Sequence, residues 1–135
     1  MRLSQKSFIL IENMLALAII AFAITIFIQF FIIGSTQTKI ASHRVSSINL
    51  IQDKVEQLKS LGYGGIIPSD FNPPQEEPVV IDIFRPDDPF DDLQGVRKTS
   101  VVDINDGKKI IVDITWAEFN RQFNESTVTV VFNLN

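Results

Sequence analysis

The chain has 135 residues, one histidine, no cysteine and a formal net charge of −4. The lack of cysteine excludes a disulfide framework and thiol catalysis, and a single histidine leaves zinc or iron without an adequate ligand set. Charge is divided unevenly, because residues 1–61 carry a net +3 and residues 62–135 a net −7. The acidic C-terminal part argues against direct contact with nucleic acid, which requires a basic face.

Residues 14–33 form one apolar segment, in which eighteen of twenty residues are apolar and only Thr25 and Gln29 interrupt the run. A helix of this length covers the hydrocarbon core of a bilayer, about 30 Å at about 1.5 Å per residue. Arg2 and Lys6 precede the run with no acid among them, which favours a cytoplasmic N-terminus. We predict a single membrane span, with the rest of the chain outside the cytoplasm.

A cleaved secretory signal would share the basic start and the apolar core. The apolar core of such a signal is shorter, at about 7–15 residues, and an A-x-A-like cleavage site follows it. No clear site of that kind follows residue 33. We therefore favour a retained membrane anchor.

Glu12 stands at the entrance of the apolar segment and is the only acid before its end. Acids in membrane segments are costly and usually functional. On spacing alone, however, a position in the headgroup layer explains Glu12 as well as a functional role does. The surrounding residues, Lys6-Ser7-Phe8-Ile9-Leu10-Ile11-Glu12 and the apolar run after them, resemble the class III signal of type IV pilins and type II secretion pseudopilins. In that family a prepilin peptidase cuts before the Phe, the new N-terminus is methylated, and the acid is retained for assembly.

The resemblance covers residues 6–62 and implies cleavage between Ser7 and Phe8, N-methylation of Phe8 and a role for Glu12 in subunit assembly. Ser7 is a departure, because the family nearly always has Gly before the cut. The implied protein is a minor pilin or pseudopilin, a structural subunit of a type IV pilus-like filament or of a type II secretion or competence pseudopilus.

The implied partners are other pilins or pseudopilins through their N-terminal helices, the prepilin peptidase, the inner-membrane assembly platform and membrane lipid. The implied location is the bacterial inner membrane, with a cytoplasmic N-terminus and a periplasmic or extracytoplasmic head. The alternative is an uncleaved, signal-anchored protein whose small extracytoplasmic domain binds a partner. That alternative needs neither the cut nor Glu12.

Helical spacing continues beyond the membrane segment. Gly34–Thr38 is polar and weakly helical, so we expect a bend or local melting there. Over residues 40–61, apolar residues recur at three and four positions, and Gly62 is the expected helix stop. The apolar face predicted to pack on a sheet consists of Val45, Ile48, Ile51, Val55 and Leu58.

Glycines and prolines predict a loop over residues 62–78, followed by a short strand over 79–84 and a second loop over 85–95. Asn105-Asp106-Gly107 suits a hairpin turn because these residue types tolerate positive φ. The flanking strands are expected at Val96–Ile104 and Lys108–Trp116. In the second of them, alternate apolar residues lie on one face: Ile110, Val112, Ile114 and Trp116. Alternating apolar residues predict a last strand over 127–134: Val128, Val130, Phe132 and Leu134.

The expected fold is α+β and pilin-like, with a long N-terminal helix packed on a small antiparallel sheet of three or four strands. The amphipathic part of the helix is expected to cover the one apolar face of the sheet, formed by the alternating apolar residues of its strands. Residues 1–7 would be the leader peptide and 8–38 the transmembrane or filament-core helix. Residues 39–135 would form the head, with an amphipathic helix over 39–61 and the sheet over 79–135.

The head offers few groups for chemistry. The best metal candidate is a group of four acids in one predicted loop: Asp87, Asp88, Asp91 and Asp92. Carboxylate oxygens close together suit Ca²⁺. Their spacing matches no EF-hand loop, so we favour a solvated acidic turn. His43 is expected to be a solvated helix residue, and Asn124-Glu125-Ser126 is a chance match to a glycosylation acceptor. No phosphate loop or catalytic constellation is present. We predict neither enzymatic activity nor a cofactor, with calcium the one ion considered.

Overall fold

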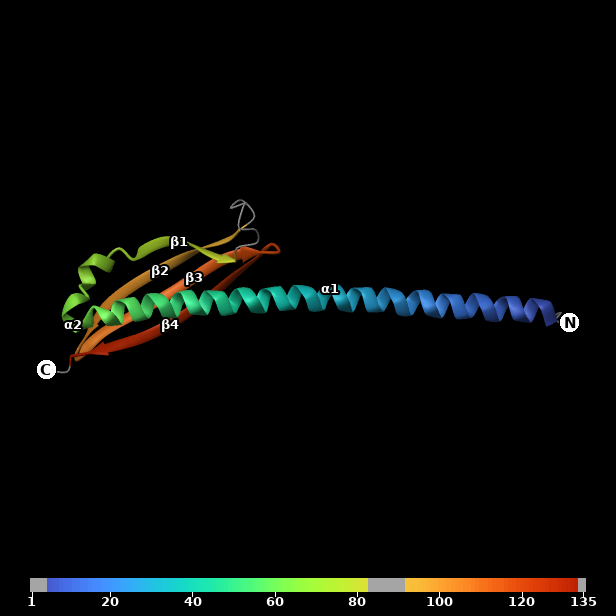
Figure 1. The fold of residues 1–135 in the computed structure, drawn as a ribbon, viewed down its shortest axis with the longest axis horizontal. Coiled ribbons are helices and arrows are strands. Elements are labelled where there is room, and N and C mark those ends of the chain that lie inside the picture. The colour runs from blue at the N-terminus through green and yellow to red at the C-terminus, as the bar shows by residue number, and fades with distance from the viewer. Residues whose placement is uncertain (1–4, 83–91, 134–135) are drawn as a thin grey trace. The chain divides into compact units, whose positions relative to one another are not determined.

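The computed structural model of the chain describes residues 5–82 and 92–133, and the side chains from residue 8 onwards within those ranges. Contacts between Cα atoms divide the chain into two units, residues 1–40 and residues 41–135, which we call the N-terminal unit and the head. The elements, labelled in Figure 1, are α1 (Gln5–Ser60), α2 (Gly62–Gly65), the 3-10 helix η1 (Pro68–Phe71), β1 (Gln75–Asp82), β2 (Leu93–Ile104), β3 (Gly107–Glu118) and β4 (Arg121–Phe132).

In the N-terminal unit, α1 continues without interruption across Gly34–Thr38, so the expected local melting is not found. The threonine hydroxyls of this segment bond to carbonyls of the same helix. Thr36 Oγ1 donates to the carbonyl of Ile32 at 3.0 Å, and Thr38 Oγ1 donates to the carbonyl of Gly34 at 3.0 Å. Each hydroxyl is thereby hydrogen-bonded within its own helix.

The head is a four-stranded antiparallel sheet in the order β1-β2-β3-β4, with the part of α1 from residue 41 onwards packed on one face (Figure 1). Each strand pairs with the next one along the chain, so only short connections are needed. The α+β prediction of a long N-terminal helix on a small antiparallel sheet is confirmed.

The core lies between α1 and the sheet. Alternate residues of β3 point toward the helix and are almost inaccessible to solvent: Ile110, Val112, Ile114 and Trp116. They meet three apolar residues of α1, namely Ile51, Val55 and Leu58. The core also contains four buried residues from other elements and loops: Ile66, Phe71, Ile81 and Val101. The period of two in the strand and of three to four in the helix accounts for this single shared core.

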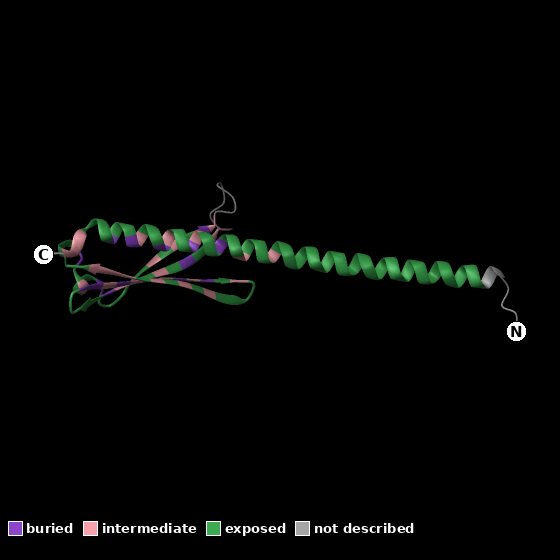
Figure 2. Cartoon of the chain, turned by 90° about the horizontal axis from the view of Figure 1, so that it is seen from below, coloured by how far each residue is buried: buried purple, intermediate pink, exposed green. Residues whose placement is uncertain are grey.

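The face that α1 buries differs from the prediction only in its first turns, since Ile51, Val55 and Leu58 are buried as expected. Val45 and Ile48, expected in the core, are 59% and 39% exposed. Their places are taken by His43 and Ser47, which lie two turns and one turn before Ile51 on the same side of the helix. Figure 2 shows this buried stripe on the side of the helix that faces the sheet. Polar contacts of His43 with Asp82 and Glu118 connect the first turns of this stripe to the sheet.

The helix α1 ends where the sequence predicts. The helix stops at Ser60, and Gly62 has a left-handed φ of +68°, which glycine adopts without steric cost. The predicted stop is confirmed.

The loop predicted over residues 62–78 is wrong at its end, because β1 already begins at Gln75. Pro78 lies inside β1, opposite Val96 of β2. β1 is an edge strand, and a proline can occupy an edge because its missing N–H faces away from the neighbouring strand. Similarly, β2 begins at Leu93, inside the second predicted loop.

The hairpin between β2 and β3 is confirmed, although its turn is not built as expected. Of the described residues, those with positive φ are Gly62, Phe119 and Asn120, so Asn105-Asp106-Gly107 does not use that conformation. Gly107 is required for space, since a Cβ there would lie 2.8 Å from the carbonyl oxygen of Val131. The left-handed pair Phe119 (49°) and Asn120 (57°) forms the turn between β3 and β4, as in a type I′ hairpin.

The apolar alternation of β4 faces away from the helix, contrary to the prediction. Val112 and Ile110 of β3 are paired with Thr127 and Thr129, and side chains directly opposite in a ladder share a face. Val128 and Phe132 therefore lie on the uncovered face, where they are 54% and 58% exposed. Leu134 is outside the described residues. From β4, the residues packed against the core are Phe123 and Val131.

Candidate functional site

The predicted processing point lies near the start of α1. Ser7 and Phe8 are both within the helix, which begins at Gln5, and the side chain of Phe8 is 66% exposed. From Phe8 to Ile33 every residue is exposed (Figure 2). In the described part of the chain, α1 is the one helix that is long and apolar enough to cross a membrane, with a mean hydropathy of 2.8 in its most apolar window.

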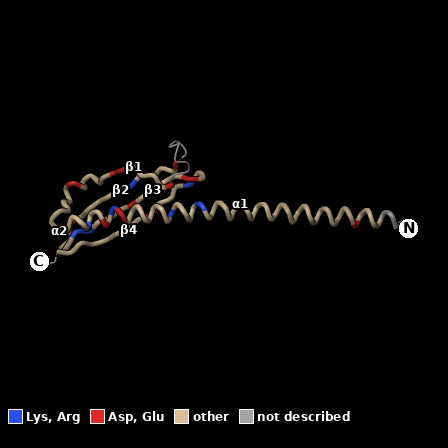
Figure 3. The backbone as a smooth tube through the Cα atoms, viewed as in Figure 1, with Lys and Arg blue, Asp and Glu red and all other residues tan. Residues whose placement is uncertain are grey.

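Glu12 is the only charged residue of this helix between Phe8 and Thr38 (Figure 3). Its side chain is exposed, and no cation among the described residues lies within ion-pairing distance of its carboxylate. A carboxylate at the edge of an apolar segment is stabilised by a cation or by hydrogen-bond donors. Such a partner for Glu12 has to come from outside the described N-terminal unit.

The two polar residues of the apolar segment are placed differently. Thr25 Oγ1 donates to the carbonyl of Ala21 at 2.9 Å, so its hydroxyl is satisfied within the helix. The side-chain amide of Gln29 has no hydrogen-bond partner among the described residues. Only Gln29 therefore carries unmet hydrogen-bonding groups in the middle of this surface.

His43, expected to be solvated, is 7% exposed and joins α1 to the sheet. Its Nε2 lies 3.0 Å from Oδ2 of Asp82, at the end of β1, and its Nδ1 lies 2.7 Å from Oε2 of Glu118, at the end of β3. Ionised carboxylates only accept hydrogen bonds, so a ring nitrogen that carries a proton donates to the carboxylate it contacts. The arrangement holds the imidazole ring between two carboxylates.

This cluster was missed by sequence reasoning because 39 and 75 residues separate His43 from its two partners. The available signal was the position of His43, which precedes Ser47 and Ile51 at four-residue intervals on what became the buried face. The two carboxylates contact opposite nitrogens of the ring and do not converge on one point. Among the residues that the structure describes, no group of three or more His, Cys, Asp or Glu side chains could hold a metal ion.

A second polar cluster lies about two to three turns further along α1. Glu77 of β1 accepts from Lys54 of α1 at 2.8 Å and from its cross-strand neighbour Arg97 at 2.5 Å. Arg97 Nη1 also donates to the carbonyl of Leu50 at 3.2 Å. The hydrogen bonds from Lys54 and then Arg97 hold the pKa of Glu77 below its usual value of 4.5, against the opposing effect of burial.

Lys108 fixes the glycine-rich segment that follows α1. Its ammonium group donates to the carbonyls of Tyr63, at 2.7 Å, and Ile66. The same group lies 4.4 Å from the centroid of the Tyr63 ring, a cation–π contact. Lys108 is 9% exposed, and these contacts satisfy its charge. Lys108 therefore has a structural role, which is to hold the segment after α1 on the sheet.

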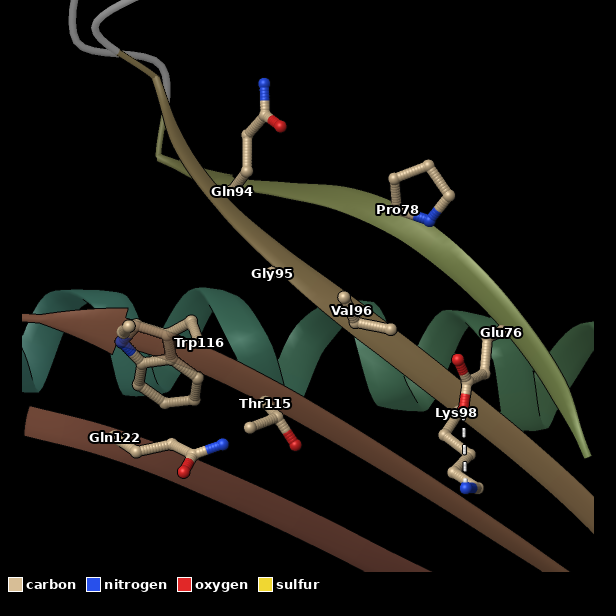
Figure 4. A pocket seen from close by; sticks show the side chains of 10 residues that line it. Glu76, Pro78, Gln94, Gly95, Val96, Lys98, Thr115, Trp116 and Gln122 are labelled. Atoms are coloured by element: carbon tan, nitrogen blue, oxygen red, sulfur yellow. Dashed lines mark ion pairs between the residues drawn. The ribbon is translucent and has the colours of Figure 1, made fainter.

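A hollow of about 590 Å³ lies over β1, β2, β3 and the start of β4 (Figure 4). Its two charged residues, Glu76 and Lys98, are paired with each other at 3.3 Å. The remaining lining combines amide, hydroxyl and aliphatic groups: Pro78, Gln94, Gly95, Val96, Thr115, Trp116, Ala117 and Gln122. These groups offer hydrogen bonds and apolar contact.

The remaining sequence candidates lie partly beyond the described residues. Asp87, Asp88 and Asp91 of the acidic loop are outside them. Asp92 is described; it is half-buried, and its Oδ1 has no hydrogen-bond partner among the residues that the structure describes. Asn124, the residue of the glycosylation-like match, is exposed within β4, opposite Thr115 of β3.

Comparison with known proteins identifies no family model that matches the chain, and no curated protein or solved structure with significant similarity.

Proposed function

We propose that this chain is a structural subunit of a filament assembled from a membrane, a minor pilin or pseudopilin of a type IV pilus-like or type II secretion-like machine. The carrying observation is Glu12, a lone carboxylate at the mouth of a fully exposed apolar helix, with no cation beside it in the described part of the chain. The resemblance of residues 6–19 to a class III signal supports the same proposal.

Processing would create the partner that Glu12 lacks. Cleavage between Ser7 and Phe8 places a positively charged amine on Phe8, four residues before Glu12. In an apolar environment an ammonium and a carboxylate are each costly alone and stabilise each other as a pair. The amine of one subunit then pairs with Glu12 of its neighbour, while the apolar residues of both helices pack together.

The exposed surface of residues 8–33 fits this function. In the membrane, lipid covers the apolar side chains; in a filament, neighbouring helices replace the lipid. Ala16, Ala18, Ala21 and Ala23 permit close approach of a second helix. The proposed location is the inner membrane, with the N-terminus in the cytoplasm and the head outside it.

The second candidate is an uncleaved, signal-anchored protein, which Ser7 favours because it stands where the pilin family has Gly. In that case the head, with its hollow over the sheet, would bind an extracytoplasmic partner, and Glu12 would be dispensable.

Glu12→Ala tests the proposal in a host that produces the assembly machine. We expect normal insertion in the membrane and a loss of at least about tenfold in the amount recovered in filaments, which corresponds to about 1.4 kcal/mol or more in assembly. Asn13→Ala, a polar-to-small change one residue further on, is the matched control and should assemble normally. Normal assembly of Glu12→Ala would reject the assembly role and favour the second candidate.

A further inference from the structure

Gln29 is the one residue of the apolar segment whose polar groups are left unmet. Thr25 satisfies its hydroxyl within the helix, at 2.9 Å from the carbonyl of Ala21, whereas the amide of Gln29 has no partner among the described residues. In hydrocarbon an amide without hydrogen bonds is energetically costly. An intramembrane polar side chain of this kind usually faces another protein segment.

Gln29 is poorly placed to reach water by itself. Four apolar residues, Phe30 to Ile33, separate it from the end of the segment, a distance of about 6 Å along the axis. Side chains of a helix tilt toward its N-terminus, so the side chain of Gln29 inclines back toward the centre of the apolar segment. The short side chain therefore cannot follow the outward route that Lys and Arg take to the interface.

The residues that share a helix face with Gln29 would admit a second helix. At about 100° per residue, Ala18, Phe22 and Thr25 lie within about 40° of Gln29. These residues follow one another at intervals of four, three and four, the spacing of a helix–helix seam. Ala18 and Thr25 are small, so a second helix can approach at these two positions, while the larger Phe22 between them packs against it. Glu12 lies about 100° away, so this face is distinct from the one that carries the assembly carboxylate.

We infer that Gln29 joins two copies of this chain in the membrane through a reciprocal pair of amide hydrogen bonds. A primary amide carries both donors and acceptors, so the same amide is its own complement. A second copy inserted in the same direction presents Gln29 at the same depth, which a partner of different sequence need not do. The inference rests on the membrane insertion in the proposed function and is independent of filament assembly.

Cross-linking in membranes tests this pairing on the full chain. The chain has no cysteine, so single-cysteine variants report one position each. Phe22→Cys lies on the Gln29 face, and Phe27→Cys lies about 160° from Gln29. The two phenylalanines are 69% and 72% exposed, which makes them a matched pair. We expect copper–phenanthroline oxidation to give a dimer with Phe22→Cys and at least about fivefold less with Phe27→Cys.

Substitution of Gln29 then separates the amide from general helix packing. In the Phe22→Cys background, Gln29→Leu should lower dimer formation about threefold to tenfold, the size of an interhelical hydrogen-bond contribution. Gln29→Asn, which keeps the amide, should retain most of it. Thr25→Val, which removes a hydroxyl that is already satisfied, should have less effect than Gln29→Leu.

Equal cross-linking at the two positions, or a dimer unchanged by Gln29→Leu, would overturn the inference. Both results are separate from the Glu12→Ala test, because the dimer is measured in a host without the assembly machine. If Glu12→Ala assembles normally while Gln29→Leu abolishes the dimer, the filament proposal fails and this inference stands.

Discussion

The two parts of α1 differ in what their surfaces require. In the N-terminal unit, the residues from Phe8 to Ile33 are all exposed, although nearly all are apolar. In the head, the same helix buries one stripe against the sheet, which is polar at His43 and Ser47 and apolar from Ile51 onwards. A helix needs an apolar stripe where its cover belongs to the same chain, and an apolar surface all round where the cover is lipid or other subunits. The contrast teaches that one element can serve two environments.

The largest effect that should separate the two regions comes from the same substitution made in each. Ile114→Ala removes a side chain that is 0% exposed and should cost the head about 2–5 kcal/mol. Ile24→Ala removes a side chain that is 54% exposed in the N-terminal unit and should change head stability by less than about 0.5 kcal/mol. Denaturant titration in detergent, followed by the fluorescence of Trp116, measures both. Similar shifts for the two variants would contradict the division into two units.

A smaller loss of head stability should follow from a substitution of His43, at the polar start of the buried stripe of α1. His43→Gln removes the imidazole ring between Asp82 and Glu118 and with it the contacts at 3.0 Å and 2.7 Å. The expected loss of head stability is about 1–3 kcal/mol, because the largely buried Glu118 carboxylate would lose its partner, whereas the half-exposed Asp82 can turn to solvent. The same Trp116 titration measures it.

Arg44→Gln is the matched control for His43→Gln. Arg44 is the next residue on α1, its side chain is 55% exposed, and it lies 3.5 Å from Glu125. Its loss should cost less than about 1 kcal/mol, as for exposed ion pairs. If Arg44→Gln proves as costly as His43→Gln, the buried cluster is not what holds this part of the helix.

The smallest effect should be the pH dependence contributed by Glu77. Its pKa is lower in the folded head than the usual 4.5, so the folded state favours the ionised carboxylate. Its contribution is therefore complete above about pH 4.5 and declines as the pH falls through the lower folded-state pKa. Glu77→Gln should flatten the acid limb of head stability against pH.

The neighbouring Glu76 provides the control for this profile. Its side chain is 60% exposed and is paired with Lys98 at 3.3 Å. Glu76→Gln should leave the acid limb close to that of the parent chain. An acid limb identical in Glu77→Gln and the parent chain would refute the role of the cluster formed with Lys54 and Arg97.

The sequence predicted those parts of the fold that local patterns determine. The long helix, its stop at Gly62, the β2–β3 hairpin and the inward face of β3 all depend on residues close together in the chain. The face of β4 could not be predicted in this way. The alternation of Val128 and Phe132 suggested a core strand, but the register with β3 turns Thr127 and Thr129 inward. A one-residue difference in register reverses both faces of a strand.

The candidate sites divide in the same way. Phe8 and Glu12 could be proposed from a contiguous motif, and their function remains a prediction. The cluster around His43 could not be, because its carboxylates come from the ends of two strands far along the chain. Likewise, β1 extends back to Gln75 because an edge strand tolerates Pro78, and edge position is a property of the whole sheet.

The most direct test of the proposed function is the mature N-terminus of the protein. Intact mass and N-terminal sequencing should be done on protein from native membranes, with and without the host's prepilin peptidase. The account predicts a chain that begins at N-methylated Phe8 when the peptidase is present and at the uncut N-terminus when it is absent. A chain that still begins at Met1 in both strains would contradict it and favour the uncleaved anchor.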